Sequence, residues 1–254
     1  MDEWEEYAKL SISFCKMHGA GNDYIYIDIR EVEGVDLGRL IPQMCDRHFG
    51  VGGDGVVLVD YDDKRMIMYN ANGSRGAICG NALRCVGHLL YLVTGEGTNV
   101  INTDLGPRRV ERVGNEYRVE IGKSEVVGRY EIDGQQVYMV NVGNLHAVAV
   151  DLDWTAKELA EKVYQAVPYL QEVGVNAEVV REEKVEVYER GTGYTLSCGS
   201  GSIAVATVLW ELGEKSDEIQ VAMKGGVLKV TREGDNKYLQ GDAIVVFRGV
   251  YDAV

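Results

Sequence analysis

The hydrophobic pattern of the chain consists mainly of short apolar segments separated by polar turn residues. Segments rich in Val, Ile and Tyr occur at 24–29, 55–69, 117–122 and 136–142, and Gly, Asp and Asn interrupt them. Short β-branched and aromatic runs bounded by such residues are typical of β-strands. The pattern therefore predicts a protein dominated by sheet.

A few longer segments have the pattern of helices. Those predicted to be helical are 36–49, 81–93, 155–167 and 200–212. Thr155 and Glu158 have the spacing of a capping box, in which each residue satisfies a backbone N–H near the helix start. The stretch AVATVLWEL at 204–212 is apolar on nearly all faces, so its helix is expected to be buried.

The second half of the chain repeats the first in five segments, at a nearly constant spacing of about 120 residues. The pairs are 16–29 with 138–152, 50–57 with 172–180, 65–70 with 184–189, 79–91 with 198–210, and 106–122 with 226–241. Shared turn residues can explain one or two such matches but not five in the same order. The repeat predicts an α+β fold of two pseudo-equivalent domains, each a mixed, mostly antiparallel sheet around a central helix. The predicted domains are 1–126 and 127–245, with the C-terminal strand 246–254 as a candidate to complete the first.

Composition and charge limit the function classes. The 254 residues are 46% hydrophobic and 26% charged, as in soluble globular proteins with a sizeable core. A net charge of -14 argues against general binding to nucleic acid or to an anionic membrane surface. The apolar runs are far shorter than the ~20 residues that a membrane helix needs. The acidic N-terminus lacks the apolar core of a secretory signal, so a cytoplasmic location is expected.

The cysteines and histidines do not have the spacing of a disulfide framework or a metal site. The cysteines are Cys15, Cys45, Cys79, Cys85 and Cys198, and the histidines are His18, His48, His88 and His146. An odd number of cysteines without a C-x-x-C pair is typical of reduced thiols in an intracellular protein. No metal site is predicted, and the histidines are interpreted as surface, core or supporting residues.

Two Cys-Gly pairs stand at the starts of corresponding predicted helices, Cys79-Gly80 and Cys198-Gly199. A helix start offers unpaired N–H groups that bind an anion, and it lowers the pKa of a cysteine placed there. If both cysteines face one cleft between the domains, one sulfur can remove a proton from a carbon while the other returns a proton to the opposite face. The N–H groups would stabilise the carboxylate as negative charge develops. Such chemistry needs no cofactor.

Six motifs carry a specific family resemblance. They are KMHGAGNDY, DRHFGVGGDG, YNANGSRGAICGNALRC, VGNLHAVA, GVNAEVV and VYERGTGYTLSCGSGS, and they span residues 16 to 202. Together they resemble the diaminopimelate epimerases of the cofactor-independent racemase superfamily. The resemblance implies interconversion of L,L- and meso-diaminopimelate in lysine and cell-wall precursor biosynthesis, by a homodimer.

The resemblance also implies roles for individual residues. Cys79 and Cys198 would be the acid/base pair. The other implied residues bind substrate. The reacting carboxylate would be held by Gly80, Asn81, Gly199 and Ser200, the amino and carboxyl groups by Asn22, Asn70, Asn144 and Asn176, and the far amino-acid end by Glu189 and Arg190. An arginine can clamp a carboxylate through two hydrogen bonds, which fits the last assignment.

The chain departs from the family pattern at four positions. Asn72, Leu145 and Tyr194 replace the usual Asp, Pro and Glu, and Gly55 stands where some members carry Gln. Tyr194 precedes Cys198 by four residues, so these departures leave the substrate range open. Residues 1–11 precede the usual start of the family and are interpreted as a frayed extension.

Other functions remain open. A proline or hydroxyproline racemase typically has C-G-H where this chain has Cys79-Gly80-Asn81, and its substrate has no second amino-acid end. A broader racemase acting on lysine-like amino acids is compatible with Tyr194 and Leu145. A non-catalytic binding or thiol redox protein would use the two cysteines as a switch, but it would not require the paired glycines.

Overall fold

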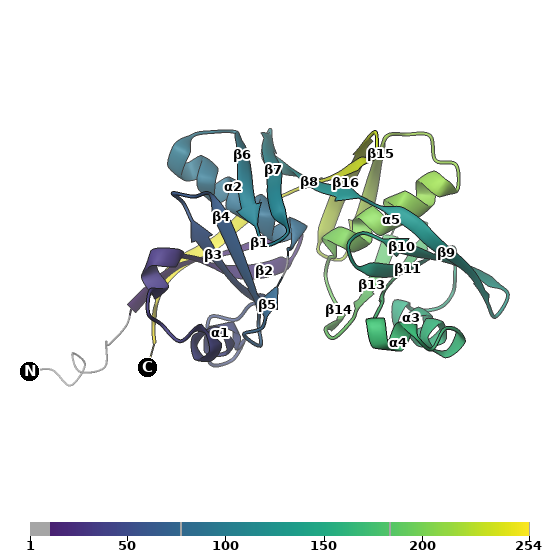
Figure 1. Ribbon diagram of the computed structural model, residues 1–254, viewed down its shortest axis with the longest axis horizontal. Helices are drawn as coiled ribbons and strands as arrows, with labels where there is room; N and C mark the ends of the chain where they lie inside the picture. The colour runs from purple at the N-terminus through teal and green to yellow at the C-terminus, as the bar shows by residue number, and fades with distance from the viewer. Residues whose placement is uncertain (1–10, 77, 183, 254) are drawn as a thin grey trace, which may run out of the picture. The chain divides into compact units, whose positions relative to one another are not determined.

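The computed structural model describes residues 11–76, 78–182 and 184–253 and divides into two compact units (Figure 1). Unit 1 runs to Tyr117 and takes up the chain again from Asp242 onwards. Unit 2 is the continuous segment Arg118–Gly241. The sequence prediction placed the corresponding boundaries after residues 126 and 245.

Unit 1 combines a mixed sheet with two α-helices. Its elements are β1 (Ser11–Gly19), β2 (Asn22–Asp28), the 3-10 helix η1 (Ile29–Val32), α1 (Leu37–Cys45), β3 (Gly55–Asp60), β4 (Arg65–Asn70), β5 (Arg75–Gly76), α2 (Gly80–Thr94), β6 (Thr98–Thr103), β7 (Gly106–Val113) and β18 (Ile244–Asp252). Strands β2 and β3 pair parallel, and β3 with β4, β6 with β7 and β1 with β2 pair antiparallel.

Unit 2 repeats most of these elements in the same order, but the counterpart of β18 lies near its start. Its elements are β8 (Glu116–Lys123), which begins at the unit boundary, β9 (Glu125–Ile132), β10 (Gln135–Asn141), β11 (Leu145–Val150), α3 (Ala156–Ala166), α4 (Leu170–Val173), β12 (Asn176–Arg181), β13 (Lys184–Glu189), β14 (Gly193–Tyr194), α5 (Gly199–Glu211), β15 (Glu218–Met223), β16 (Gly226–Glu233) and β17 (Asn236–Gly241). Strands β11 and β12 pair parallel, as β2 and β3 do in unit 1.

One pairing distinguishes the two units. In unit 2, β9 pairs antiparallel with β10, the strand that follows it. In unit 1 the equivalent partner of β1 is β18, from the other end of the chain. The observed architecture is the mixed, mostly antiparallel α+β fold that the sequence predicted, built twice.

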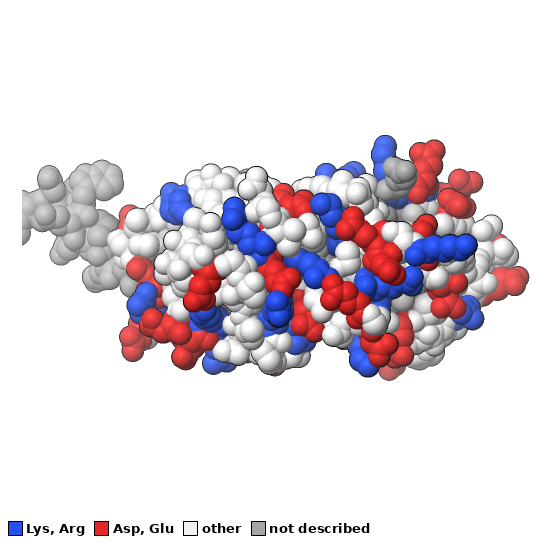
Figure 2. All heavy atoms as spheres, turned by 90° about the horizontal axis from the view of Figure 1, so that it is seen from above, with Lys and Arg blue, Asp and Glu red and all other residues white. Residues whose placement is uncertain are grey.

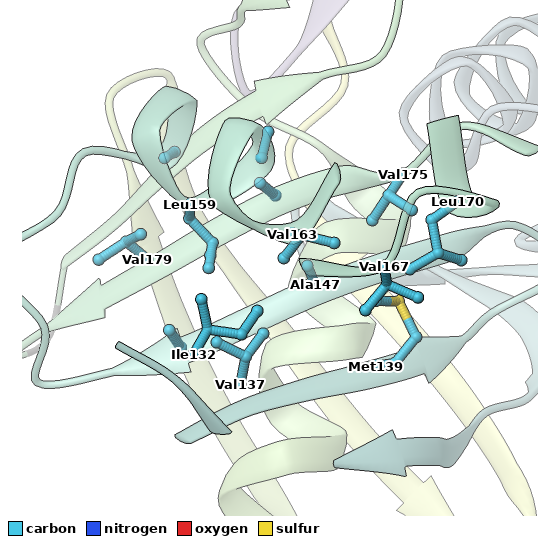
Figure 3. Close-up of a cluster of buried hydrophobic side chains, with 14 of the residues drawn as sticks. Ile132, Val137, Met139, Ala147, Leu159, Val163, Val167, Leu170, Val175 and Val179 are labelled. Carbon is cyan, nitrogen blue, oxygen red and sulfur yellow. The ribbon is translucent and has the colours of Figure 1, made fainter. Parts of the chain in front are cut away.

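The apolar segments of the sequence form the cores. Helix α5 has buried residues over most of its length and contacts β9, β10, β11, β12, β15, β16 and β17. This confirms the predicted burial of the AVATVLWEL segment for 204–208, whereas Glu211 and Leu212 at its end are exposed. A second apolar layer lies between these strands and α3 with α4, where Leu159, Val163 and Leu170 pack on Met139 and Ala147 (Figure 3). In unit 1, α1 covers an equivalent cluster.

Local signals explain where the helices begin and end. Thr155 and Glu158 form the predicted capping box at the start of α3. The prediction of a helix over 36–49 is wrong beyond Cys45, because the Asp46 carboxylate accepts hydrogen bonds from the backbone N–H groups of His48 and Phe49 and closes a turn. Of the predicted N-terminal extension, residues 1–10 lie outside the described residues, and Ser11 begins β1.

The charged side chains are distributed over the surface without a large basic area on the face drawn in Figure 2, where acidic and basic groups alternate. Among the residues that the structure describes, no helix is long and apolar enough to cross a membrane. Within the same residues, no group of three or more His, Cys, Asp or Glu side chains is placed to hold a metal ion.

Candidate active site

Cys79 occupies the N-cap position of α2. Its backbone is extended, and its carbonyl oxygen accepts the first helical hydrogen bond, from Leu83 N–H at 2.9 Å. The half-buried thiol donates to Asn22 Oδ1 at 3.2 Å, and the amide of the buried Asn81 donates to the same oxygen at 3.3 Å. Strand β2 begins at Asn22, directly after the tight turn at Gly21, where φ is 80°. The structure therefore brings together three of the predicted site residues, Asn22, Cys79 and Asn81.

Asn70, another of the predicted asparagines, ends β4. The register of β3 and β4 pairs it with Gly55, and its amide donates to Ser74 Oγ at 2.9 Å across the turn to β5. The next residue, Ala71, donates its backbone N–H to the Asp54 carbonyl at 3.1 Å. Gly80 follows Cys79 as the first residue of α2.

Cys198 occupies the same position at the start of α5, but it is buried. Its sulfur accepts a hydrogen bond from Gly201 N–H at 3.3 Å and lies 3.4 Å from Ser200 Oγ. Its own N–H donates to the sulfur of Met223. Gly199 and Ser200 form the first turn of the helix, as predicted. Gly201 has no room for a side chain, because a Cβ atom would lie 2.5 Å from the Glu178 carboxylate.

The pKa of Cys198 differs from the expectation. The position at a helix start predicted a lowered pKa, but burial, followed by the nearby carboxylates of Glu189 and Glu178, raises it well above its ordinary value. Hydrogen bonds from Ser200 and Gly201 act in the opposite direction and do not outweigh this effect. Burial also raises the pKa of Glu189, with Glu178 adding to it. The prediction of a lowered pKa for Cys198 is therefore wrong for this environment.

The far-end residues predicted from the sequence lie at the end of β13. Glu189 accepts a hydrogen bond from Thr195 Oγ1 at 2.6 Å. Arg190 is exposed, its backbone N–H donates to Asn176 Oδ1 at 2.9 Å, and its guanidinium donates to the Val173 carbonyl. Its side chain crosses Gly174, where a Cβ atom would lie 1.9 Å from Arg190 Cδ. Asn176 therefore holds the backbone of Arg190 in place through this hydrogen bond.

We call the residues around Cys79 in unit 1 and around Cys198 in unit 2 the two half-sites. Sequence reasoning did not single out three residues of these half-sites. His146 and Glu178 are fully buried, and His146 Nδ1 lies 2.8 Å from Glu178 Oε1 while Nε2 lies 3.1 Å from Asn144 Oδ1. In unit 1, Asp54 bonds to Asn22. A signal was present for Glu178, which is a charged residue inside the apolar strand β12 and points to a buried polar partner.

The comparison with known families decides the assignment. A family model described as diaminopimelate epimerase matches residues 14–127 and 138–246. The chain belongs to the diaminopimelate epimerase family. This confirms the family predicted from the six motifs.

Curated members of the diaminopimelate epimerase family align with nearly the whole chain. The diaminopimelate epimerase of Rickettsia felis is 34% identical over 264 residues, covering 94% of this chain and 97% of the relative. That of Archaeoglobus fulgidus is 36% identical over 273 residues, covering 95% and 96%. Tyr194, Leu145 and Gly55 all lie within the segments that the family model matches.

Solved structures share the fold at low sequence identity. A hydroxyproline epimerase from Agrobacterium vitis, with bound trans-4-hydroxy-L-proline, has a TM-score of 0.67 at 15% identity and covers 96% of this chain and 94% of its own. A phenazine biosynthesis protein of the PhzF family from Enterococcus faecalis has a TM-score of 0.69 at 12% identity, with coverage of 95% and 99%. These similarities confirm the fold class.

Proposed function

We propose that the protein is a diaminopimelate epimerase that interconverts the L,L and meso forms by moving the α-proton between two cysteines. Family membership supports the reaction, and the sequence predicted the same isomerase. One observation supports the roles of the two cysteines. Cys79 is the N-cap of α2 and Cys198 is the N-cap of α5, and each helix packs against the strands of its own unit.

The chemistry requires one sulfur as a base and one as an acid. The thiolate form of one cysteine removes the α-proton, and the thiol of the other gives its proton to the opposite face, which inverts the carbon. Roles exchange when the reaction runs in reverse. The pKa of Cys198 is raised, so its thiol is protonated near neutral pH unless a neighbour accepts the proton. The Glu189 carboxylate, whose pKa is also raised, is placed to accept it.

The helix starts provide the electrostatic stabilisation. As the proton leaves the α-carbon, charge moves onto the substrate carboxylate. We assign its binding to the N–H groups of the first turns, at Gly80 and Asn81 in unit 1 and at Gly199 and Ser200 in unit 2. The remaining N–H of this turn in unit 2, that of Gly201, already donates to the Cys198 sulfur.

The remaining assignments concern recognition. Asn22, Asn70, Asn144 and Asn176 would bind the amino and carboxyl groups, and Glu189 with Arg190 would bind the far amino-acid end. The exposed guanidinium of Arg190 donates here to a backbone carbonyl, which a substrate carboxylate can replace as the stronger, charged partner. We further propose action without a cofactor, in the cytoplasm and as a homodimer. A role in lysine biosynthesis is also proposed, and the family name supports it.

The proposal is tested by incubating the reduced protein with L,L-diaminopimelate in deuterated water. We expect deuterium to appear at the α-carbon together with meso product.

Cys79→Ser and Cys198→Ser are each expected to abolish epimerisation, because an alcohol is a far weaker acid than a thiol at neutral pH. Cys15→Ser is the matched control, since Cys15 is a buried residue of β1 outside the two half-sites. Near-normal turnover in both site variants would contradict the mechanism, and absence of exchange in the wild-type protein would exclude the epimerase.

A broader amino-acid racemase is the second candidate. The residue that favours it is Tyr194, which is exposed in β14 and packs edge-on against Tyr188, with ring centroids 5.2 Å apart. Activity on lysine comparable to that on diaminopimelate would support this alternative. A thiol redox protein would show neither activity.

A further inference from the structure

Asp54 belongs to the motif DRHFGVGGDG, but the proposed function gives it no role. Its Oδ2 atom accepts hydrogen bonds from the Asn22 side-chain amide at 2.7 Å and from Asp23 N–H at 3.2 Å. Its Oδ1 atom accepts a hydrogen bond from Arg47 at 2.9 Å. The carboxylate therefore lies one hydrogen bond away from the residue that contacts the Cys79 thiol.

The segment around Asp54 is fixed on both sides. Its backbone N–H donates to the Asp23 carbonyl at 2.7 Å, and its own carbonyl accepts from Ala71 N–H at 3.1 Å. Arg47 also forms two hydrogen bonds with the Asp23 carboxylate, at 2.7 and 3.1 Å. These contacts hold the backbone of Asp54, while its 38% exposed side chain is held by its own hydrogen bonds to Asn22 and Arg47.

This contact determines which way the Asn22 amide faces. An asparagine side chain can present its oxygen or its nitrogen with almost the same shape, and only its partners select the orientation. An ionised carboxylate only accepts hydrogen bonds, so Asp54 must face the Asn22 nitrogen. The Asn22 oxygen then faces the Cys79 thiol and the Asn81 amide, at 3.2 and 3.3 Å.

We propose that Asp54 is a positioning residue that orients Asn22 as a hydrogen-bond acceptor and thereby holds Cys79 in its proton-carrying thiol form. An acceptor beside the sulfur stabilises S–H relative to the thiolate, whereas a donor would stabilise the thiolate. Cys79 would then be the acid in the direction in which Cys198 removes the α-proton. This last step rests on the proposed function, but the orientation of Asn22 and the state of Cys79 do not.

The variant Asp54→Asn reverses this arrangement. The introduced amide has one acceptor oxygen, and the positively charged Arg47 competes for it more strongly than the two neutral donors at the other position, the Asn22 amide and Asp23 N–H. The nitrogen of the introduced amide then faces Asn22, which turns its own oxygen toward position 54 and its nitrogen toward Cys79. In this variant, a hydrogen bond that favours the Cys79 thiol is replaced by one that favours its thiolate. The pH midpoint of Cys79 alkylation should therefore fall by about one unit.

Loss of the Asp54 charge could favour the thiolate without any change at Asn22. Asn22→Leu separates the two routes, since leucine has a similar size and no polar atom. In the Asn22→Leu background, Asp54→Asn should no longer shift the midpoint if the effect passes through Asn22. Titratable groups near Cys79 include Tyr26 of β2, Arg84 and Cys85 of α2, and Tyr24, whose hydroxyl also bonds to Asn22 and Cys79, and all of them are retained in every variant.

The experiment measures the rate of iodoacetamide modification at Cys79 against pH in the intact protein, with peptide mass spectrometry to identify the modified cysteine. Asp62→Asn is the matched control, because Asp62 is 85% exposed and its ion pair is with Arg30. We expect a lower midpoint in Asp54→Asn, an unchanged one in Asp62→Asn, and recovery in Asp54→Glu. Asp54→Ser provides a second test of the same shift if Asp54→Asn folds poorly.

An unchanged midpoint in folded Asp54→Asn or Asp54→Ser would overturn the proposal. A shift of equal size in the Asn22→Leu background would overturn it as well, since the charge of Asp54 would then act directly. No substrate is present in this assay, so its outcome is independent of whether the protein epimerises diaminopimelate.

Discussion

At the scale of single residues, the two cysteines share a position but have different partners. The thiol of Cys79 donates to a neutral amide oxygen, while Cys198 receives a hydrogen bond from Gly201 N–H and lies near the carboxylates of Glu189 and Glu178. Buried carboxylates close to a sulfur disfavour its thiolate. The two half-sites are therefore chemically distinct, although they occupy equivalent places in the repeat.

The contribution of Glu189 to Cys198 can be measured. Glu189→Gln removes a negative charge that raises the Cys198 pKa, so the pKa of the thiol should fall and its alkylation should begin at lower pH. Glu182→Gln, at an exposed position between β12 and β13, is the control. Alkylation of Cys198 as a function of pH reports the change directly. An unchanged profile would show that burial and Glu178 raise this pKa without a contribution from Glu189.

At the scale of elements, the parallel strand pairs β2–β3 and β11–β12 organise the half-sites. In unit 1, Asp54 lies just before β3 and contacts Asn22 at the start of β2. In unit 2, Glu178 lies near the start of β12 and contacts His146 near the start of β11. The Asn22–Asp54 and His146–Glu178 contacts both span 32 positions in the sequence. The same supersecondary unit therefore supplies an acidic side chain to the half-site in each repeat.

Gly55 shows how closely the strands approach in unit 1. A Cβ atom at this position would lie 2.1 Å from the Tyr69 carbonyl oxygen, a backbone atom of the neighbouring strand β4. Gly55→Ala should therefore lower the free energy of unfolding by about 1–3 kcal/mol, as overpacking typically does. Gly97→Ala is the control, because its nearest neighbour would lie 3.9 Å away. Chemical denaturation measures both, and equal stability of the two variants would contradict the expected clash.

At the scale of the whole molecule, the two units differ in how the chain completes them. Unit 2 is continuous, whereas unit 1 requires the C-terminal segment, in which β18 pairs with β1 from Ser11 opposite Asp252 to His18 opposite Ile244. Asp242, at the start of that segment, accepts a hydrogen bond from Ala20 N–H at 2.7 Å, and its carbonyl accepts one from Arg84 at 2.9 Å. Arg84 is fully buried, so these contacts compensate part of its desolvation.

This difference predicts the behaviour of fragments. Residues 118–241 expressed alone should fold and unfold in one cooperative transition, because their core and sheet are complete. Residues 11–117 should not, because β1 loses its pairing with β18 and keeps only β2, and the buried Arg84 loses its bond to Asp242. Thermal unfolding followed by circular dichroism distinguishes the two fragments. A cooperative transition in 11–117 would show that β18 is dispensable for unit 1.

The sequence by itself determined the features that depend on neighbours within a few residues or on repetition. The capping box at Thr155, the buried part of the helix at 204–208 and the two Cys-Gly helix starts follow from local spacing, and the six motifs identified the family. The end of α1 was missed, because one Asp46 side chain closed a turn that the apolar pattern did not reveal.

Only the tertiary structure decided the electrostatics of the half-sites. The raised pKa of Cys198 depends on burial and on two carboxylates from different strands. Glu189 lies at the end of β13, and Glu178 lies in β12. The orientation of Asn22 depends on Asp54, which is 32 positions away in the sequence. A helix start favours a thiolate through local dipoles, but burial and charges brought in by strand pairing reverse this preference at Cys198, because their effect on the pKa is the larger one.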